Sequence, residues 1–336
     1  MALGALTVSQ VLVACLQVLL PGLQVPLAGP TGGGHVVDDA RSSAAASSWI
    51  AIAPKLVCGE LESLAEHRAA TGIKSAAIVP IESICDGFPA PDTQQSICGF
   101  LKSAAARGGA QFVLLVGDAG VLPPGRMRIG STTRCITDSI YADDDGDSIP
   151  ERAVGRFPSA DAPLVRQYAD RIVAYERDSK PAGWRRRISF LAAQGGFGAV
   201  IDSALDSAVS GLLDRELPAA FDLRVLRPDA NPHSGVPRKS EKNALRDLWE
   251  SGSLVFLYAG HGSRNGMHTA DAGPFTRTIF TTSDARQLSI RGGAPFVMMF
   301  ACNYDGVPRS QESGGSQGAL RARSPACRPA LARRSS

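Results

Sequence analysis

The sequence predicts an α/β protein with three layers, α/β/α, around a mostly parallel sheet, and three observations support this class. From Trp49 onward, short apolar runs alternate with amphipathic segments, the order that produces a parallel sheet covered by helices. The runs at 254–259 and 295–301 contain no charged residue, which is typical of strands buried on both faces. Apolar residues make up 44% of the 336 residues and charged residues 20%, so the chain can bury a sizeable core.

The other elements follow from local patterns. Further strands are predicted at 49–53, 75–81, 112–116, 153–157, 187–192 and 222–226. Helices, where apolar residues recur at helical spacing, are predicted after Pro54, from Asp92 to about 106, from Asp161, at 198–217 and at 240–249. Leu56 and Leu61 are expected on the apolar side of the first helix, and the polar section 119–152 is expected to be a loop.

The folded region is expected to span 49–303, with two sub-domains of about 49–160 and 161–303. Residues 1–30 include an apolar stretch that prolines interrupt, which argues against a stable membrane span and resembles the core of a signal peptide. No Lys or Arg precedes Arg41, so the basic start of such a peptide is missing, and a disordered or misassigned start is the alternative. Residues 31–48 have the composition of a linker. We expect a secreted or cell-surface protein.

Charge and cysteine content exclude some classes. The net charge is +3, and part of the excess lies in the arginine-rich last stretch, so the nearly neutral body argues against a nucleic-acid partner. The seven cysteines form no C-x-x-C pair, which argues against a structural zinc site. An odd number leaves one thiol free after disulfides form, and it fits a reduced protein equally well.

The last two apolar runs end in residues that can perform nucleophilic chemistry. His261 follows the first run, and Cys302 follows the second. Parallel neighbours end at the same edge of a sheet, so the imidazole and the thiol can meet there, where the imidazole favours the reactive thiolate. The backbone N–H groups of Gly262 and Cys302 are candidates for an oxyanion hole. Taken singly, either residue is more often only packed or hydrogen-bonded, but the two together favour catalysis.

Three stretches resemble the gingipain family of cysteine peptidases, which has a caspase-like fold. Residues 258–263, Tyr-Ala-Gly-His-Gly-Ser, resemble the histidine motif of that family. Residues 295–302 resemble its nucleophile motif, and residues 151–157 are similar to its E-x-x-[IV]-G-R-F segment. With weaker similarities upstream, the resemblance extends over about 49–303.

The resemblance implies a cysteine endopeptidase that hydrolyses peptide bonds of protein or peptide substrates through a thioester acyl-enzyme. Cys302 would be the nucleophile and His261 the base, and catalysis would need no cofactor. The resemblance places the acid that orients the imidazole at Glu151. Glu151 is equally compatible with a calcium ligand or a solvated carboxylate.

Alternating carboxylates with a glycine turn form a candidate calcium loop. Asp143, Asp145 and Asp147 can direct oxygen ligands at Ca²⁺, and the carbonyl of Ile149 is a further candidate. The glutamate that ends an EF-hand loop is absent, which leaves Glu151 as the nearby carboxylate able to help. The gingipain resemblance supports a structural calcium site, and an acidic surface turn is the alternative.

The end of the chain shows no helical or strand period. Residues 304–336 are rich in Ser, Gly, Ala, Arg and Pro and are expected to be a disordered or aberrant tail. Because the family continues with a helix and strands after the nucleophile, the chain resembles a truncated or frame-shifted member. The alternative function is therefore a catalytically inactive, calcium-stabilised protein-binding module. A flavodoxin-like domain is disfavoured, since the glycine-rich loop 195–198 lacks a phosphate-binding fingerprint.

Overall fold

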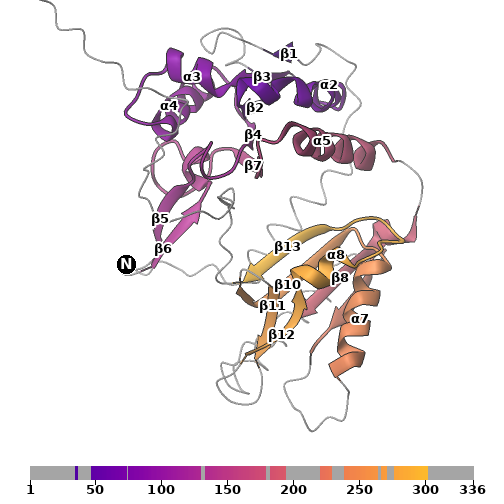
Figure 1. Cartoon of the computed structure of the whole chain (residues 1–336). Coiled ribbons are helices and arrows are strands. Elements are labelled where there is room, and N and C mark those ends of the chain that lie inside the picture. The colour runs from indigo at the N-terminus through magenta and orange to yellow at the C-terminus, as the bar shows by residue number, and fades with distance from the viewer. Residues whose placement is uncertain are drawn as a thin grey trace, which may run out of the picture. The chain divides into compact units, whose positions relative to one another are not determined.

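The computed structural model describes residues 35–36, 47–73, 75–129, 133–178, 182–193, 220–228, 238–263, 266–270 and 276–301. These residues fall into two compact units that divide after residue 179 (Figure 1). Outside the described residues lie the predicted signal segment 1–30, most of the linker 31–48, the helix predicted at 198–217, Cys302 and the tail 304–336. Among the helices that are described, none combines the length and the hydropathy of a membrane span.

The first unit contains a parallel sheet of five strands in the order β1-β3-β2-β4-β7. The strands are β1 (His35–Val36), β2 (Trp49–Ala53), β3 (Ala76–Pro80), β4 (Phe112–Val116) and β7 (Ala153–Phe157). Both β2 and β3 are buried along their whole length, because each has a strand on both sides and helices over both faces.

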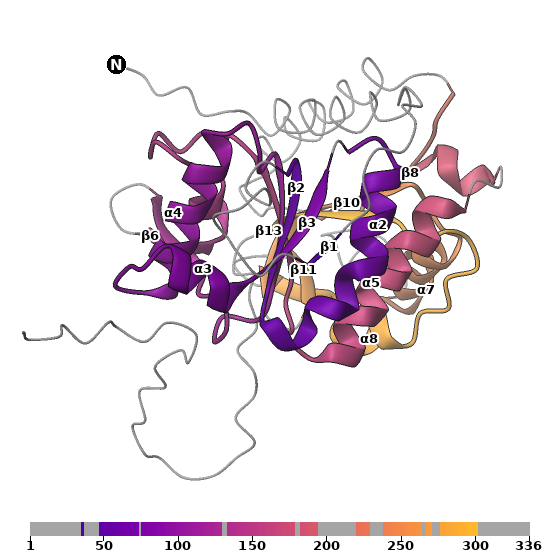
Figure 2. The ribbon, with the colours of Figure 1, turned by 90° about the horizontal axis from the view of Figure 1, so that it is seen from above.

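Helices cover the two faces of this sheet and confirm the three-layer prediction for the first unit. On one face lie the 3-10 helix η3 (Lys55–Leu61) and the helices α2 (Glu62–Ala70) and α5 (Ala162–Arg177). On the other face lie α3 (Ile81–Gly87) and α4 (Thr93–Ala105), as Figure 2 shows. The division of the chain follows α5 because Val165, Ala169 and Val173 bury this helix against the first sheet.

Polar caps set two helix starts where the sequence predicts them. The carboxylate of Asp92 accepts a hydrogen bond from the N–H of Gln95 at 2.8 Å, and that of Asp161 accepts one from Leu164 at 3.1 Å. Such a cap contributes about 1 kcal/mol. The prediction for Leu56 is wrong, since its side chain is 93% exposed. Residues 55–61 form a 3-10 helix, whose three-residue turn moves this position off the buried side.

The section 119–152, predicted to be a loop, contains a β-hairpin and a short 3-10 helix. Strand β5 (Gly125–Ile129) pairs antiparallel with β6 (Thr133–Thr137), and η4 (Ser139–Tyr141) follows. The loop prediction is wrong here because each strand has only two larger apolar residues: β5 mixes them with two arginines, and β6 mixes them with one arginine and two threonines. Their composition therefore resembles that of a polar loop.

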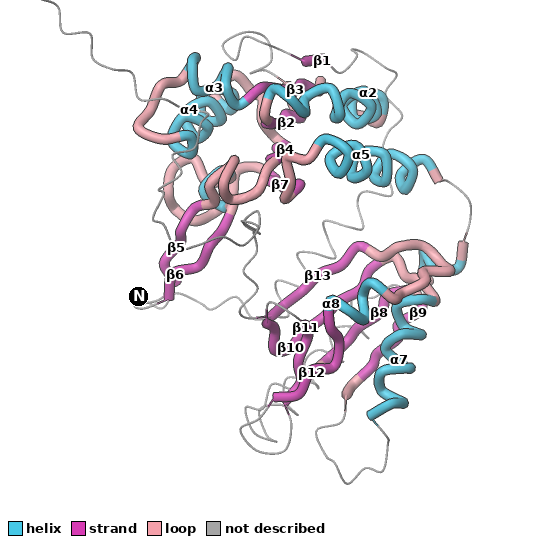
Figure 3. Tube along the Cα trace, viewed as in Figure 1, coloured by secondary structure: helices cyan, strands magenta, loops and turns pink. Residues whose placement is uncertain are grey.

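The second unit contains a mixed sheet of six strands (Figure 3). The strands are β8 (Arg187–Ala192), β9 (Asp222–Leu226), β10 (Val255–Ser263), β11 (Gly266–Ala270), β12 (Thr276–Thr281) and β13 (Phe296–Ala301). Strands β9, β8, β10 and β13 are parallel neighbours in that order. The far end of β10 turns into an antiparallel ladder with β11, which in turn pairs with β12.

The helix α7 (Arg238–Glu250) covers one face of this sheet, and the short α8 (Thr282–Arg286) follows β12. Trp249 of α7 stacks on Phe256 of β10, with ring centroids 3.8 Å apart. A separate apolar cluster that includes Phe190 and Leu257 lies on the other face.

The two apolar runs differ in burial. The first four residues of β10 are buried, as predicted for a central strand. The prediction that the second run is buried on both faces is wrong, since Phe296 at the start of β13 is 56% exposed. Within the described part of the chain, β13 pairs with β10 alone. An apolar run does not by itself distinguish a central strand from an edge strand.

Candidate active site

The carboxyl ends of β10 and β13 lie side by side. Their parallel ladder begins with Val255 opposite Phe296 and ends with Gly260 opposite Ala301. His261 is the next residue on β10, directly after the last described pair of this ladder. In open α/β folds, this edge is where ligands bind.

His261 also begins the antiparallel part of β10, where its cross-strand partner is His268 of β11. His261 is half-buried, as is Gly262 after it. The ring of His268 is held from two sides: Nε2 lies 2.7 Å from Oγ of Ser263, and Nδ1 lies 3.1 Å from Oγ1 of Thr278. The sequence assigned His268 no role, because β11 has no strand-like apolar run that would place it beside His261.

Gly260 is required by close packing. A Cβ at this position would lie 2.6 Å from Cβ of Ala193 and 2.7 Å from the phenol oxygen of Tyr258. Both separations are far shorter than normal carbon contacts. Residue 260 therefore has to lack a side chain for Ala193 and Tyr258 to lie where they do.

Cys302 lies outside the described residues, and β13 ends at Ala301 just before it. Two other cysteines, Cys58 and Cys98, are not disulfide-bonded, and the first is buried and the second half-buried. Burial raises the pKa of the Cys98 thiol. Cys85 forms a disulfide bond.

Glu151 lies in the other unit, just before β7. Its carboxylate accepts a hydrogen bond from the N–H of Asp144 at 2.6 Å, and its own N–H donates to the carbonyl of Ala142 at 2.9 Å. These contacts bring Glu151 to the acidic loop that the sequence singled out.

The acidic loop gathers carboxylates around one point. Ligand oxygens of Asp143, Asp145, Asp147 and Glu151 all lie within 4.8 Å of one another. The N–H of Gly146 donates to Asp143 at 2.6 Å, and backbone N–H groups further along the loop bond to the other two aspartates in the same way. These oxygens fit a hard cation such as Ca²⁺.

Asp144 interrupts this alternation and takes no part in the cluster. Its carboxylate pairs with Arg152, whose side chain is 2% exposed. Arg152 also donates to the carbonyls of Tyr141 and Ala110, at 2.8 and 3.2 Å. The guanidinium thus holds the loop to the body of the unit through the one aspartate that the cluster does not use.

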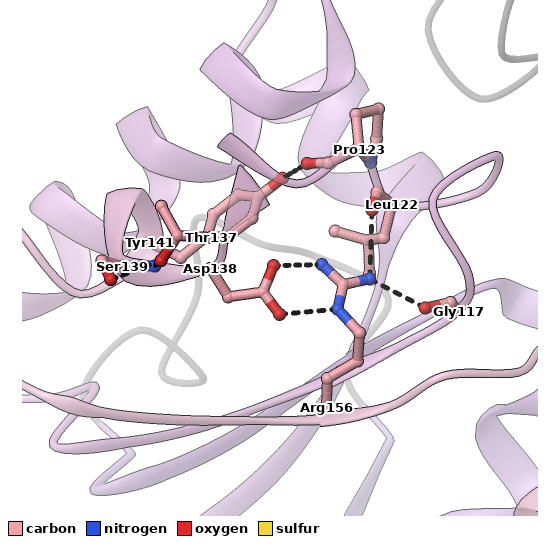
Figure 4. Close-up of polar contacts among 8 residues, drawn as sticks. All are labelled: Gly117, Leu122, Pro123, Thr137, Asp138, Ser139, Tyr141 and Arg156. Carbon is pink, nitrogen blue, oxygen red and sulfur yellow. Dashed lines mark hydrogen bonds and ion pairs between the residues drawn. The ribbon is translucent and has the colours of Figure 1, made fainter. Parts of the chain in front are cut away.

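Arg156 anchors the opposite end of β7 (Figure 4). Its Nε and Nη2 atoms donate to both carboxylate oxygens of Asp138, at 2.7 and 2.6 Å. Its Nη1 donates to the carbonyls of Gly117 and Leu122, at 2.8 and 3.0 Å. Nearby, the phenol of Tyr141 donates to the carbonyl of Pro123, and burial raises the pKa of Tyr141 far above its usual value. The sequence marked this segment without a role for Arg156, although a cation in a buried sheet calls for a partner.

A comparison with protein families identifies the family of this chain. The profile of peptidase family C25 matches residues 42–323, so the chain belongs to this family, the gingipain family that the motifs predict. The match covers the expected folded region and continues beyond Asn303. Among curated proteins, the comparison gave no match.

Two solved structures are similar to this chain. One is titled "Complex of Porphyromonas gingivalis RgpB pro- and mature domains", with a TM-score of 0.55 and 22% identity over 76% of this chain and 55% of that chain. The other is titled "Structure of Protease", with a TM-score of 0.53 and 19% identity over 79% of this chain and 54% of that chain. This chain therefore spans about half the length of either structure. The likeness confirms the predicted caspase-like α/β fold.

Proposed function

We propose that the protein is a cysteine-type endopeptidase in which Cys302 is the nucleophile and His261 is the base. The observation that carries the proposal is the register of β10 and β13, in which Gly260 lies opposite Ala301. Each of these residues directly precedes one member of the pair. Paired strands lie about 4.8 Å apart and consecutive α-carbons about 3.8 Å apart, so chain connectivity keeps the α-carbons of His261 and Cys302 within about 12 Å.

Side-chain alternation supports the same pairing. Ala259 of β10 and Phe300 of β13 pack with one apolar cluster, on the face opposite α7. Alternate residues of a strand share a face. His261 and Cys302 each follow one of these residues by two positions, which favours a shared face for the imidazole and the thiol.

In the proposed reaction, the imidazole of His261 accepts the thiol proton and the sulfur attacks the scissile carbonyl carbon. The C–N bond breaks as the imidazolium protonates the leaving amine, which leaves a thioester on Cys302. Water then hydrolyses the thioester and regenerates the thiol. The N–H groups of Gly262 and Cys302 would donate to the transient oxyanion, at about 3 kcal/mol per donor. We assign Glu151 to orienting the imidazole.

The acidic loop is the proposed site of a structural calcium ion. Asp143, Asp145 and Asp147 would hold it with the carbonyl of Ile149, and the ion would fix the loop ahead of β7. The grouping of carboxylate oxygens in the acidic loop supports this proposal. Glu151 contributes to the same cluster, so its roles as a metal ligand and as an orienting acid compete.

We propose that the protein is exported and acts on protein or peptide substrates. The disulfide at Cys85 supports export, because disulfides persist in oxidising compartments. Family membership supports peptide substrates.

Alkylation by iodoacetamide tests the proposal directly. At about pH 6, well below the usual thiol pKa of about 8.5, mass spectrometry should find Cys302 labelled many times faster than Cys98. The variant His261→Ala should remove this advantage and leave Cys98 unchanged. Equal labelling of Cys302 in wild type and variant would overturn the dyad. A quenched-peptide assay with Cys302→Ala as control separates a peptidase from an inactive binding module, which would cleave nothing.

A further inference from the structure

We propose that Tyr258 is the positioning residue for His261, because its phenol holds the backbone at the base of the imidazole. The inference rests on the proposed role of His261 and adds a residue that acts through it. Tyr258 lies three positions earlier on β10, and its side chain is fully buried.

The phenol bridges two strands at the histidine pair. Its O–H lies against the carbonyl oxygen of His261 and 2.8 Å from the carbonyl oxygen of His268. The N–H of His268 donates back to the phenol oxygen at 3.1 Å. One side chain therefore meets the backbone of both members of the cross-strand pair.

The strand pairing changes near the two histidines. The last described pair of the β10–β13 ladder is Gly260 with Ala301, and the antiparallel pairing of β10 with β11 begins at His261. In addition, the register between β11 and β12 shifts between Met267 and His268. Shifts of this kind disturb the regular ladder, so hydrogen bonds from a side chain to the backbone add support there. The phenol of Tyr258 makes such hydrogen bonds with the backbone of both histidines.

Gly260 and Tyr258 form a matched pair. The phenol oxygen lies 2.7 Å from the place where a Cβ on residue 260 would stand, so the absence of that side chain makes room for the phenol. Alternation along the strand puts these two residues on one face and His261 on the other. The glycine therefore makes room for the phenol of Tyr258. The hydrogen bonds of this phenol, which we call the Tyr258 clamp, fix the peptide from which the imidazole of His261 projects.

The variant Tyr258→Phe isolates the hydrogen bonds, because it keeps the buried ring and removes only the oxygen. The matched control is Tyr141→Phe in the other unit, since Tyr141 is also fully buried and donates to a carbonyl. Both variants lose a buried phenol oxygen. Only the first loses the clamp on His261.

The experiment measures the rate of Cys302 alkylation against pH in the full chain, together with the melting temperature. We expect Tyr258→Phe to lower the rate near pH 6 by roughly 10-fold or more and to bring the pH profile toward that of His261→Ala. Tyr141→Phe should leave the profile unchanged even where it lowers the melting temperature. A wild-type profile in Tyr258→Phe would overturn the inference.

A second readout separates this inference from the proposed dyad. If Cys302 reacts equally in wild type and in His261→Ala, the dyad fails and alkylation no longer reports on Tyr258. In that case, the NMR signal of the His261 ring proton, assigned with His261→Ala, tests whether Tyr258 positions His261. We expect Tyr258→Phe to change its shift and its titration while the signal of His67 stays in place. His268 is the titratable neighbour on β11, so the titration is repeated in His268→Gln. An unchanged His261 signal would refute the clamp.

Discussion

Replacement of Arg156 by methionine is expected to destabilise the first unit by about 3 kcal/mol. Removing one member of a buried ion pair costs about 3–5 kcal/mol, because the other charge stays buried without a partner. The side chain of Arg156 is 7% exposed and that of Asp138 is 22% exposed, so water can partly rehydrate the carboxylate and the lower end applies. The carbonyls of Gly117 and Leu122 lose their donor in the same variant.

Two further variants test the cause. The variant Asp138→Asn keeps the shape of the side chain and leaves Arg156 its two carbonyl partners, so we expect a smaller loss of about 1–2 kcal/mol. The double variant Arg156→Met with Asp138→Leu removes both charges. It should recover part of the loss, because no unpaired charge stays behind.

Hydrogen exchange measured by mass spectrometry on peptides from β4 and β7 gives the opening free energy of this unit alone. A loss below 1 kcal/mol in Arg156→Met would show that the contacts contribute little. A double variant that is no more stable than Arg156→Met would refute the argument from an unpaired charge.

Three other perturbations have defined outcomes. Gly260→Ala should destabilise the second unit by about 1–3 kcal/mol through overpacking. The control is Gly99→Ala in α4, where the atom nearest to an added Cβ is 3.9 Å away, and this change should be neutral or stabilising. Thermal melts compare the two variants. Burial alone would raise the pKa of Glu176. The hydrogen bonds and charges of Arg68 and His67 outweigh this effect, so the pKa of Glu176 is lowered overall. Glu176 therefore stabilises the fold above its unfolded pKa of about 4.3, and the deficit of Glu176→Gln in urea melts at neutral pH should vanish as the pH falls through the lowered folded value. Added Ca²⁺ should raise the melting temperature of the wild type, and Asp145→Asn should reduce that rise; equal rises would count against the loop as the site.

The parts of the fold that the sequence predicted are those set by short-range patterns. The strands Trp49–Ala53 and Phe112–Val116 have the predicted bounds, since each is an apolar run in the middle of a parallel sheet. The helix starts after Asp92 and Asp161 also agree, because a capping carboxylate acts within three residues of its own position.

The parts that the sequence missed depend on partners far along the chain. Strand β11 contains Gly, Thr and His and becomes a strand because β10 and β12 lie on either side of it. Likewise, Arg156 is a buried cation only because the loop after β4 and the segment after β6 bring carbonyls and a carboxylate to it. The sequence immediately around these residues does not show which distant segments will pair with them.

The candidate site combines both kinds of information in one strand. A rule of topology suffices to predict that the residues after the two apolar runs share an edge, and the ladder from Val255 to Gly260 agrees with it. The orientation of the imidazole depends instead on the pairing of His261 with His268, which no local pattern indicates. The motif Tyr-Ala-Gly-His-Gly-Ser then has a physical reading. Tyr258 and Gly260 share one face, where the phenol contacts the backbone. His261 and Ser263 lie on the opposite face, where Ser263 contacts the ring of His268.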